Sequence, residues 1–329
     1  MIGRTALAAV FIFTTALIVS AQNPDLDPEY RATFSIIARD PATGELGHAE
    51  TSKALAGGTN FGAAKGGVGV ITNQAATFMM YGKIGIQMLE MGFTPEQALQ
   101  YMLKTDDQRE NRQVAIIDVQ GRTAAFTGKN TSEWHGHKCG VNYCVQANTM
   151  TGPEVVEAVS RSFEGSSGPL PERLLDALDA GQAQGGDKRG KQEAYLIVVR
   201  PGASSGGWSD KVMEIRVDDN PVPLVEARRI LNKVRSGRII TEGNQKLNSQ
   251  DAAGALQLFI AARDKSPDND NAWVALANGY LRNNRKAEAL DALRKAVELN
   301  PNNRTRLPAN ANFQSLLKDP EFLKITGQQ

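Results

Sequence analysis

The sequence has very little cysteine and almost no excess charge of either sign. Among its 329 residues there are only two cysteines, and 37 Lys and Arg residues nearly balance 36 Asp and Glu residues, which leaves a formal net charge of +1. A chain without a basic excess lacks the electrostatic attraction that binding to nucleic acids or anionic membranes requires. The composition therefore argues against a nucleic-acid-binding protein.

Two common site motifs are also missing. No G-x-S-x-G elbow accompanies the three histidines, His48, His135 and His137, so a Ser-His triad is not expected. The glycine-rich stretch GGTNFGAAKGG, residues 57–67, lacks the G-K-[ST] ending of a phosphate-binding loop. Nucleotide chemistry is not expected, and the sequence calls for no cofactor.

The one long hydrophobic run of the sequence lies at its N-terminus. Arg4 precedes an apolar stretch from Thr5 to Val19, and small residues follow up to Ala21. This order is typical of a secretory leader that is cleaved after Ala21. The alternative is an uncleaved membrane anchor, but the run is shorter than the ~20 residues that span a bilayer comfortably. We therefore predict a signal peptide over residues 1–21, no stable membrane anchor, and a secreted or periplasmic mature protein.

The two cysteines lie close together in HKCGVNYC, residues 137–144. In an oxidising compartment Cys139 and Cys144 can form a disulfide across a tight hairpin. Two buried free thiols, and a metal site shared with His135 and His137, are the alternatives. The spacing does not match the paired short spacings of structural zinc sites, so no metal is predicted.

The chain changes character near residue 220. Before that point, short apolar runs alternate with turn signals, which predicts strands at 34–38, 46–51, 67–72, 113–119, 123–127, 143–146, 195–200 and 212–217. Helical periodicity marks 81–91, 94–104, 153–164 and 171–183, and TPEQ at 94–97 is a capping box. Because strands and helices come in blocks rather than in regular alternation, we predict an α+β fold with antiparallel sheets and helices grouped on their faces.

The C-terminal part contains an internal repeat with the tetratricopeptide (TPR) period of about 34 residues. One unit has residues of the expected type at Trp273, Leu276, Ala277, Tyr280, Ala289, Leu293, Ala296 and Pro301. The preceding unit matches at Gly243, Ala255, Phe259, Ala262 and Pro267. We predict an all-α domain of two TPR repeats with C-terminal capping helices over residues 236–329.

Residues 33–234 resemble a known family on several long motifs. These are TFSIIARDPATGELG, the pair Ser52-Lys53, KGGVGVITNQA, RQVAIIDVQGRTAAFTG, YCVQAN, GPEVVEA, AGQAQGGDKRGKQ and RVDDNPVPLVEARRIL. On these motifs the domain is identified as a member of the domain-of-unknown-function family 1028, whose members are similar to N-terminal-nucleophile (Ntn) hydrolases. The resemblance implies a four-layer αββα sandwich, and it implies hydrolysis of amide-type C–N bonds by a threonine at the chain terminus.

Thr33 is the nucleophile that the resemblance implies. A hydroxyl is a weak nucleophile without an adjacent base, and a free α-amino group, which titrates near pH ~8, supplies one on the same residue. Nearby cations keep such an amine neutral. By similarity to proteasome-type hydrolases we expect Lys65 in this role, Lys53 in reserve, and Glu50 as the acid on the second strand. For both lysines the alternative is a solvated charge that protects a strand edge.

Further polar side chains are candidates for contacts with a substrate. Amide groups at strand ends suit this task because they donate hydrogen bonds without a net charge. The candidates are Asn73, Gln74, Gln146, Asn148, Asp187, Arg189 and Gln192. For Asp187 and Arg189 the alternative is a turn that Asp187 caps and an ion pair between the two.

Two functions follow from the sequence. The first is a secreted amidohydrolase that acts on a small amide or peptide-like substrate, once residues 22–32 are removed as a propeptide. The alternative is a non-catalytic secreted scaffold, in which the TPR segment recruits a protein or cell-envelope partner. The sequence leaves a homo-oligomer open.

Overall fold

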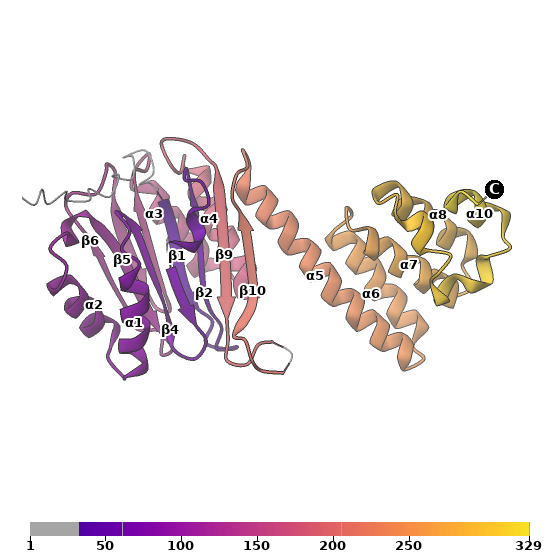
Figure 1. Ribbon diagram of the computed structural model, residues 1–329, viewed down its shortest axis with the longest axis horizontal. Helices are drawn as coiled ribbons and strands as arrows, with labels where there is room; N and C mark the ends of the chain where they lie inside the picture. Colours follow the sequence, from indigo (N-terminus) through magenta and orange to yellow (C-terminus); the bar gives the residue numbers. More distant parts are fainter. Residues whose placement is uncertain (1–32, 61, 205, 329) are drawn as a thin grey trace, which may run out of the picture.

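The computed structural model describes residues 33–60, 62–204 and 206–328 (Figure 1). This part of the chain is a mixed α/β region with two antiparallel sheets, followed by a helical region. The predicted signal peptide and the segment 22–32 lie outside the described residues. Within them, no helix is both long enough and apolar enough to cross a membrane.

The larger sheet has six strands in the order β10-β9-β2-β1-β8-β7. Their bounds are β1 Thr33–Arg39, β2 Leu46–Ser52, β7 Gly136–Gly140, β8 Tyr143–Asn148, β9 Glu193–Val199 and β10 Lys211–Val217. The smaller sheet has the order β3-β4-β5-β6, with β3 Gly62–Lys65, β4 Gly69–Ala75, β5 Arg112–Asp118 and β6 Thr123–Thr127. All the pairings between these strands are antiparallel, as predicted.

Helices cover the outer face of each sheet. The strand period of two sends alternate apolar residues outward. Phe34 and Ile36 of β1 pack in a core with α3 Glu154–Gly165 and α4 Leu170–Ala183, while Ile71 of β4 packs in a second core with α1 Met80–Glu90 and α2 Pro95–Lys104. The capping box at Thr94 is formed as predicted. The chain thus builds helix, sheet, sheet and helix layers.

The layer between the sheets has two different ends. Toward the Arg39 end of β1 it is apolar, with Ile37, Leu46, Val70, Ala115, Ile117, Cys144 and Val199 in one cluster. Toward Thr33 the inward-facing residues are polar, although they are equally buried. Burial of polar groups is unfavourable unless they are paired. The polar end is therefore the part of the core that packing alone does not explain.

A single helix joins the sheets to the helical region. Helix α5 runs without a break from Pro223 to Asn248, and Figure 1 shows it leading away from the sheets. Its first half packs in the α3–α4 core through Leu224, Ala227 and Leu231, and Arg235 forms an ion pair with Glu172 of α4. The predicted boundary at residues 234–236 therefore falls inside a helix, and the last turns of α5 begin the first repeat.

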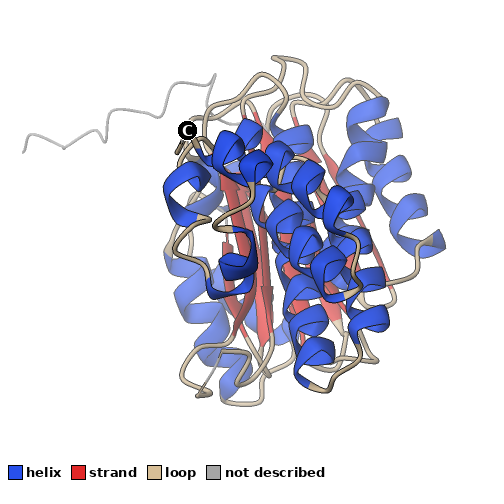
Figure 2. Ribbon diagram, turned by 90° about the vertical axis from the view of Figure 1, so that its right-hand side faces the viewer, coloured by secondary structure: helices blue, strands red, loops and turns tan. Residues whose placement is uncertain are grey.

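The remaining helices pack as repeats, and they stand in front of the strands in Figure 2. They are α6 Ala252–Lys265, α7 Asp270–Arg282, α8 Lys286–Leu299, α9 Asn303–Arg306 and α10 Pro320–Thr326, with the 3₁₀ turn η4 at Ala311–Leu316. Gly243 and Gly279 are needed where Phe259 inserts between helices, because a Cβ at either would lie within 2.7 Å of its ring. The absence of a side chain at these two positions lets the helices approach the Phe259 ring closely.

Two strands have no counterpart in the sequence prediction. Strand β3 consists of glycine, alanines and one lysine, which carry almost no strand signal. Strand β7, GHKCG, is an edge strand with two of its five residues exposed and none buried, so it lacks a clear hydrophobic alternation. The eight predicted strands and the four predicted helices before α5 are all present, with ends that differ by up to three residues.

Candidate functional site

Thr33 begins β1, and its side chain faces the layer between the sheets. It is paired with Ser52 of β2 on one side and with Asn148 of β8 on the other. Its hydroxyl donates a hydrogen bond to Ser52 Oγ over 3.2 Å, and the residue is fully buried. The predicted nucleophile therefore lies at the polar end of the layer.

Amide side chains from the second sheet hold this strand end. Gln74 of β4 donates through Nε2 to the Thr33 carbonyl oxygen at 3.0 Å and to Gln113 Oε1 at 2.8 Å, and its Oε1 accepts from Ser35 Oγ at 2.8 Å. Asn148 Nδ2 donates to the same Gln113 oxygen at 3.0 Å. The two sheets are thus linked at Thr33 by a network in which each amide has partners.

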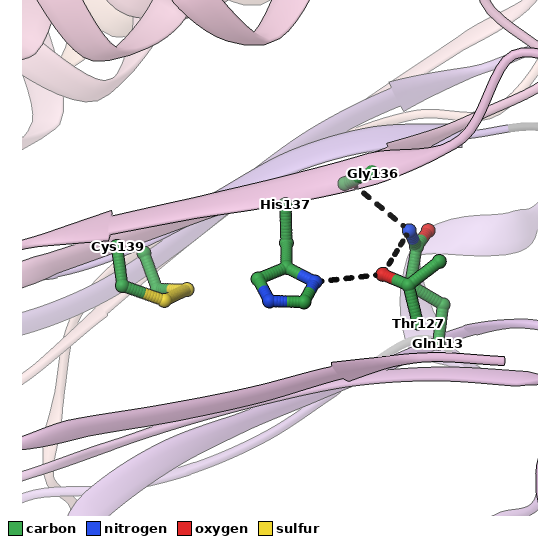
Figure 3. The surroundings of a disulfide bond; sticks show 6 residues. Gln113, Thr127, Gly136, His137 and Cys139 are labelled. Atoms are coloured by element: carbon green, nitrogen blue, oxygen red, sulfur yellow. Dashed lines mark hydrogen bonds between the residues drawn. A yellow bond between two sulfur atoms is a disulfide. The ribbon is translucent and has the colours of Figure 1, made fainter.

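Gln113 of β5 is the hub of this network. Its Nε2 group also lies within 3.1 Å of the carbonyl oxygens of Gly136 and Ala147 and of Thr127 Oγ1. Figure 3 shows Gln113 beside Thr127 and Gly136, with the His137 ring pointing toward Thr127; the His137 Nδ1–Thr127 Oγ1 distance is 2.9 Å. The network therefore extends from Thr33 to the edge strand β7.

Strand β7 is joined to β8 by a disulfide between Cys139 and Cys144, which are directly paired in the ladder. The first of the three alternatives for these cysteines is thus the one in the structure. His135 and His137 take no part in a metal-ligand cluster, and the described residues contain no group of three or more His, Cys, Asp or Glu suited to a metal ion.

Three buried ionisable residues lie beside the amide network. His48 and Glu50 of β2 and Glu193 of β9 are each at most 1% exposed. Burial lowers the pKa of His48 to about 3, so the ring is neutral, and burial raises the pKa of Glu50 and of Glu193 well above the usual range. Proximity of Glu50 raises the pKa of Glu193 further. The carboxyl groups are therefore held in their protonated forms to a higher pH than exposed ones.

The two candidate lysines have different positions. Lys65 lies at the far end of the layer: the next residue, Gly66, packs against Arg200, beyond the Val199–Leu46–Arg39 end of the ladder. Its half-exposed ammonium pairs with Glu90 of α1. The structure does not bring Lys65 to Thr33. Its position agrees with the alternative interpretation, a solvated charge at a strand edge. Lys53 follows Ser52, close to the start of β1 in the ladder.

The Asp187 carboxylate organises a turn. It accepts hydrogen bonds from the backbone N–H of Lys53 at 3.0 Å and of Arg189 at 2.9 Å, and it forms an ion pair with the Arg189 guanidinium at 2.9 Å. These are the contacts of the alternative reading, a capped turn with an ion pair. The turn nevertheless anchors the segment that follows β2, close to Thr33.

The remaining candidates divide by the face on which they lie. Gln146 shares the inner face of β8 with Asn148, and its Nε2 lies 3.4 Å from Thr72 Oγ1. Asn73 shares a face of β4 with Ile71, which packs toward α1 and α2, so it points away from Thr33. Gln192 precedes β9 and donates to Asp219 at 3.3 Å. Gln74, Gln146 and Asn148 are the predicted amides that the fold gathers at the polar end.

Comparison with known proteins places the chain in a family. The family model described as "Family of unknown function (DUF1028)" matches residues 33–227. The chain belongs to this family. A crystal structure of a DUF1028 protein from Silicibacter pomeroyi is similar, with 28% sequence identity and a TM-score of 0.57 over 61% of this chain and 85% of that one. A tetratricopeptide repeat model matches residues 247–307, and such repeats suggest protein–protein interaction.

The sequence analysis missed several residues of the candidate site. Ser35, Gln113 and Glu193 were not singled out, and His48 was considered only as a triad member. The sequence does carry a signal at His48, Glu50 and Ser52: these three polar residues alternate along β2 and therefore share one face of the strand. For Gln113 and Glu193 the only signal is a polar residue at the start of an apolar strand, which is also where ordinary strands begin.

Proposed function

We propose that the protein is a secreted amidohydrolase of the Ntn type, with Thr33 as its nucleophile. The observation that carries the proposal is the position of Thr33 as the first residue of a central strand, with its hydroxyl inside a polar layer. The stacking of two sheets between two pairs of helices is the architecture expected of an αββα Ntn sandwich. The substrate class is an amide-type C–N bond.

The chemistry needs a free amino group on Thr33. Once residues ahead of Thr33 are removed, this amine takes the proton from the Thr33 hydroxyl while the oxygen attacks the substrate carbonyl. The proton passes to the leaving nitrogen as the C–N bond breaks, and an ester on Thr33 remains. Water then attacks the ester, the amine takes a proton from this water and passes it to the Thr33 oxygen as the ester C–O bond breaks, and the carboxylic acid leaves.

Burial of Thr33 takes the role that the sequence analysis gave to a lysine, which is to keep the Thr33 amine neutral. Removal from water disfavours the charged form of an amine, so burial favours the neutral base without a nearby cation. Gln74 fixes the Thr33 carbonyl, and Ser52 accepts from the Thr33 hydroxyl, so both ends of the nucleophile are oriented. The amides of Asn148 and Gln146 lie on the neighbouring strand as candidates to stabilise the oxyanion.

The mature N-terminus tests this proposal. We expect N-terminal sequencing of the protein from its natural compartment to read from Thr33. Thr33→Ala should abolish turnover of amide substrates with the unfolding midpoint nearly unchanged, while Thr33→Ser should retain part of the activity. A mature chain that begins at Gln22 would contradict the proposal, since the amine would then be tied up in a peptide bond.

The TPR match favours a second function, recruitment of a protein partner in the same secreted compartment. A cavity of about 520 Å³ lies at the repeats and is lined mostly by amide side chains, with Asn278 and Arg282 among them. Because α5 packs on both domains, removal of the repeats should leave this helix intact. Deletion of residues 249–329 should therefore lose a co-purifying partner, and full-length Arg282→Glu should weaken its capture.

A further inference from the structure

Two carboxyl groups on the same face of the larger sheet as Thr33, those of Glu50 and Glu193, have no hydrogen-bond partner on either oxygen among the described residues. The ring nitrogens of His48 also lack partners; Nε2 lies 3.4 Å from Glu50 Oε2, without hydrogen-bond geometry. A buried polar group left without a partner lowers stability, and native proteins contain few of them. Six such atoms in one cluster are better explained by ligand binding than by packing.

The register of the larger sheet sets the cluster beside the nucleophile. Asn148, Thr33, Ser52 and Glu193 form one row across β8, β1, β2 and β9. Gln146, Ser35, Glu50 and Tyr195 form the next row on the same face. Neighbouring strands lie about 4.8 Å apart, so Glu193 is about 10 Å from Thr33 along its row. A substrate chain of that length would connect Thr33 with Glu193.

We propose that Glu50 and Glu193 form a subsite for a positively charged amine group of the substrate. An ammonium group has three N–H donors and no acceptor, so it matches carboxylate oxygens that lack donors. This assignment to a substrate rests on the proposed hydrolase function, whereas the binding of an amine to the cluster does not. The enzyme would then act on amides that carry an amine at their other end.

The charges around the cluster agree with a site for a cation. His48 from β2 is neutral, and Tyr195 from β9 donates its hydroxyl to Glu214 at 3.0 Å. From β10, Arg216 lowers the pKa of Glu193, but this guanidinium is ion-paired with Asp218 at 2.7 Å. Within the described residues, no Lys or Arg forms an ion pair with Glu50 or Glu193. An ammonium group would supply both the charge and the donors.

The turn after β2 forms a wall of this subsite. The 3₁₀ turn η2, Gly57–Thr59, packs on β9, and a Cβ at residue 58 would lie 2.4 Å from the Tyr195 Cβ. The Gly58 N–H lowers the pKa of Glu193, although it does not reach hydrogen-bond geometry with either oxygen. The same segment is anchored by Asp187 through the Lys53 N–H. The anchored turn thus connects the two carboxyls with the neighbourhood of Thr33.

Calorimetric titration of the full-length protein with n-butylammonium chloride tests the subsite, with n-butanol as the uncharged probe. We expect butylammonium to bind and butanol not to bind. Binding should weaken by about tenfold or more in Glu193→Gln and Glu50→Gln, because each loses one charged acceptor. Glu90→Gln is the matched control, since this carboxyl lies at the surface beside Lys65. Equal binding in wild type and Glu193→Gln, or none in wild type, would overturn the proposal.

The pH dependence of binding keeps the test valid if a variant fails to fold. Only ionised carboxyl groups attract the cation, so binding to the wild type should tighten as pH rises toward 9, below the amine pKa of about 10.4. Binding should also release protons, which appears as a different heat in buffers of different ionisation enthalpy. Binding that is independent of pH, without proton release, would contradict the proposal.

Thr33→Ala separates the subsite from the proposed function. This variant should bind butylammonium like the wild type even though it has no nucleophile. If the wild type binds the amine but hydrolyses no amide, the subsite stands and the hydrolase proposal fails. If the enzyme hydrolyses hexanamide as well as 6-aminohexanamide, the hydrolase proposal stands and the subsite fails as a determinant of specificity.

Discussion

The core of the TPR repeats and the polar end of the layer between the sheets are both buried, yet they are built from opposite side chains. In the repeats, Phe259, Leu276 and Leu293 fill the space between helices. The few buried polar groups there include Ser236, which donates to the Ala262 carbonyl oxygen at 2.8 Å. In the layer, amides, hydroxyls and carboxyls fill the corresponding space. Burial of hydrocarbon stabilises the repeat core. In the layer, hydrogen bonds compensate only part of the cost of burying polar groups.

This difference in composition shows that the repeat core contributes to stability, whereas the polar end of the layer needs another explanation. A repeat core made of hydrocarbon follows from packing alone. The polar end contains the paired amides of Gln74 and Gln113, and beside them the unpartnered carboxyls of Glu50 and Glu193. Unpaired buried acids lower stability, so their presence beside Thr33 is better explained by binding or chemistry.

The largest effect on stability is expected from truncation of a buried side chain in the repeat core. Phe259→Ala should lower the free energy of unfolding by about 3–5 kcal/mol, because the ring is fully buried and leaves a cavity against Gly243 and Gly279. Urea unfolding followed by circular dichroism measures this. Amide turnover by the folded variant should equal that of the wild type. The matched control is Phe93→Ala, since this ring is 41% exposed; an equal loss there would refute the packing argument.

The fold was largely predictable, because its elements follow local rules. Short apolar runs between turn signals predicted the eight strands. The repeat spacing predicted the positions that pack around Phe259. Strand β3 escaped prediction, since Gly62 to Lys65 form a strand only by pairing with β4. The sequence also did not predict that α5 runs without a break across the domain boundary. The continuity of this helix depends on contacts of Leu231 and Arg235 with residues distant in sequence.

The site was predictable only where a polar residue at one strand end marks it. Thr33, Gln74 and Asn148 were identified in this way, whereas the role of Gln113 depends on partners from other strands that are distant in sequence. Lys65 was expected near Thr33 by analogy with the third strand of proteasome-type hydrolases, whereas here it ends β3, before a turn that packs on Arg200. Pairing across sheets cannot be deduced from periodicity, since each strand reports only its own two faces.

A smaller effect should appear in the pH dependence of stability at the polar end. Glu50 and Glu193 have raised pKa values in the folded state, so as pH rises the unfolded carboxyls lose their protons first. Stability therefore falls with rising pH, by at most about 1.4 kcal/mol per pH unit for each proton involved. His48 acts in the opposite sense only below about pH 6.5, because its pKa is lowered on folding.

Denaturant unfolding above pH 6.5, where His48 no longer contributes, follows the carboxyl groups, and comparison with Glu50→Gln isolates their contribution. Glu50→Gln should reduce the decline in stability over this window, and Glu90→Gln should leave it unchanged. A wild-type stability that rises across the window would show that the carboxyls are already ionised and paired in the folded protein. Phe259→Ala should shift the whole curve downward without changing its slope, which separates packing from ionisation.

The smallest effect should come from Lys65, and it separates the observed site from the one inferred by analogy. Its ammonium pairs with Glu90 at the surface, where solvent weakens the interaction. Lys65→Ala should therefore leave both the unfolding midpoint and the pH profile of amide turnover within experimental error. Lys53→Ala is the informative companion, because Lys53 follows Ser52 and its backbone is held by Asp187. If Lys65→Ala shifted the alkaline limb of the profile, a cation remote from Thr33 would be tuning its amine, and burial alone would not account for the base.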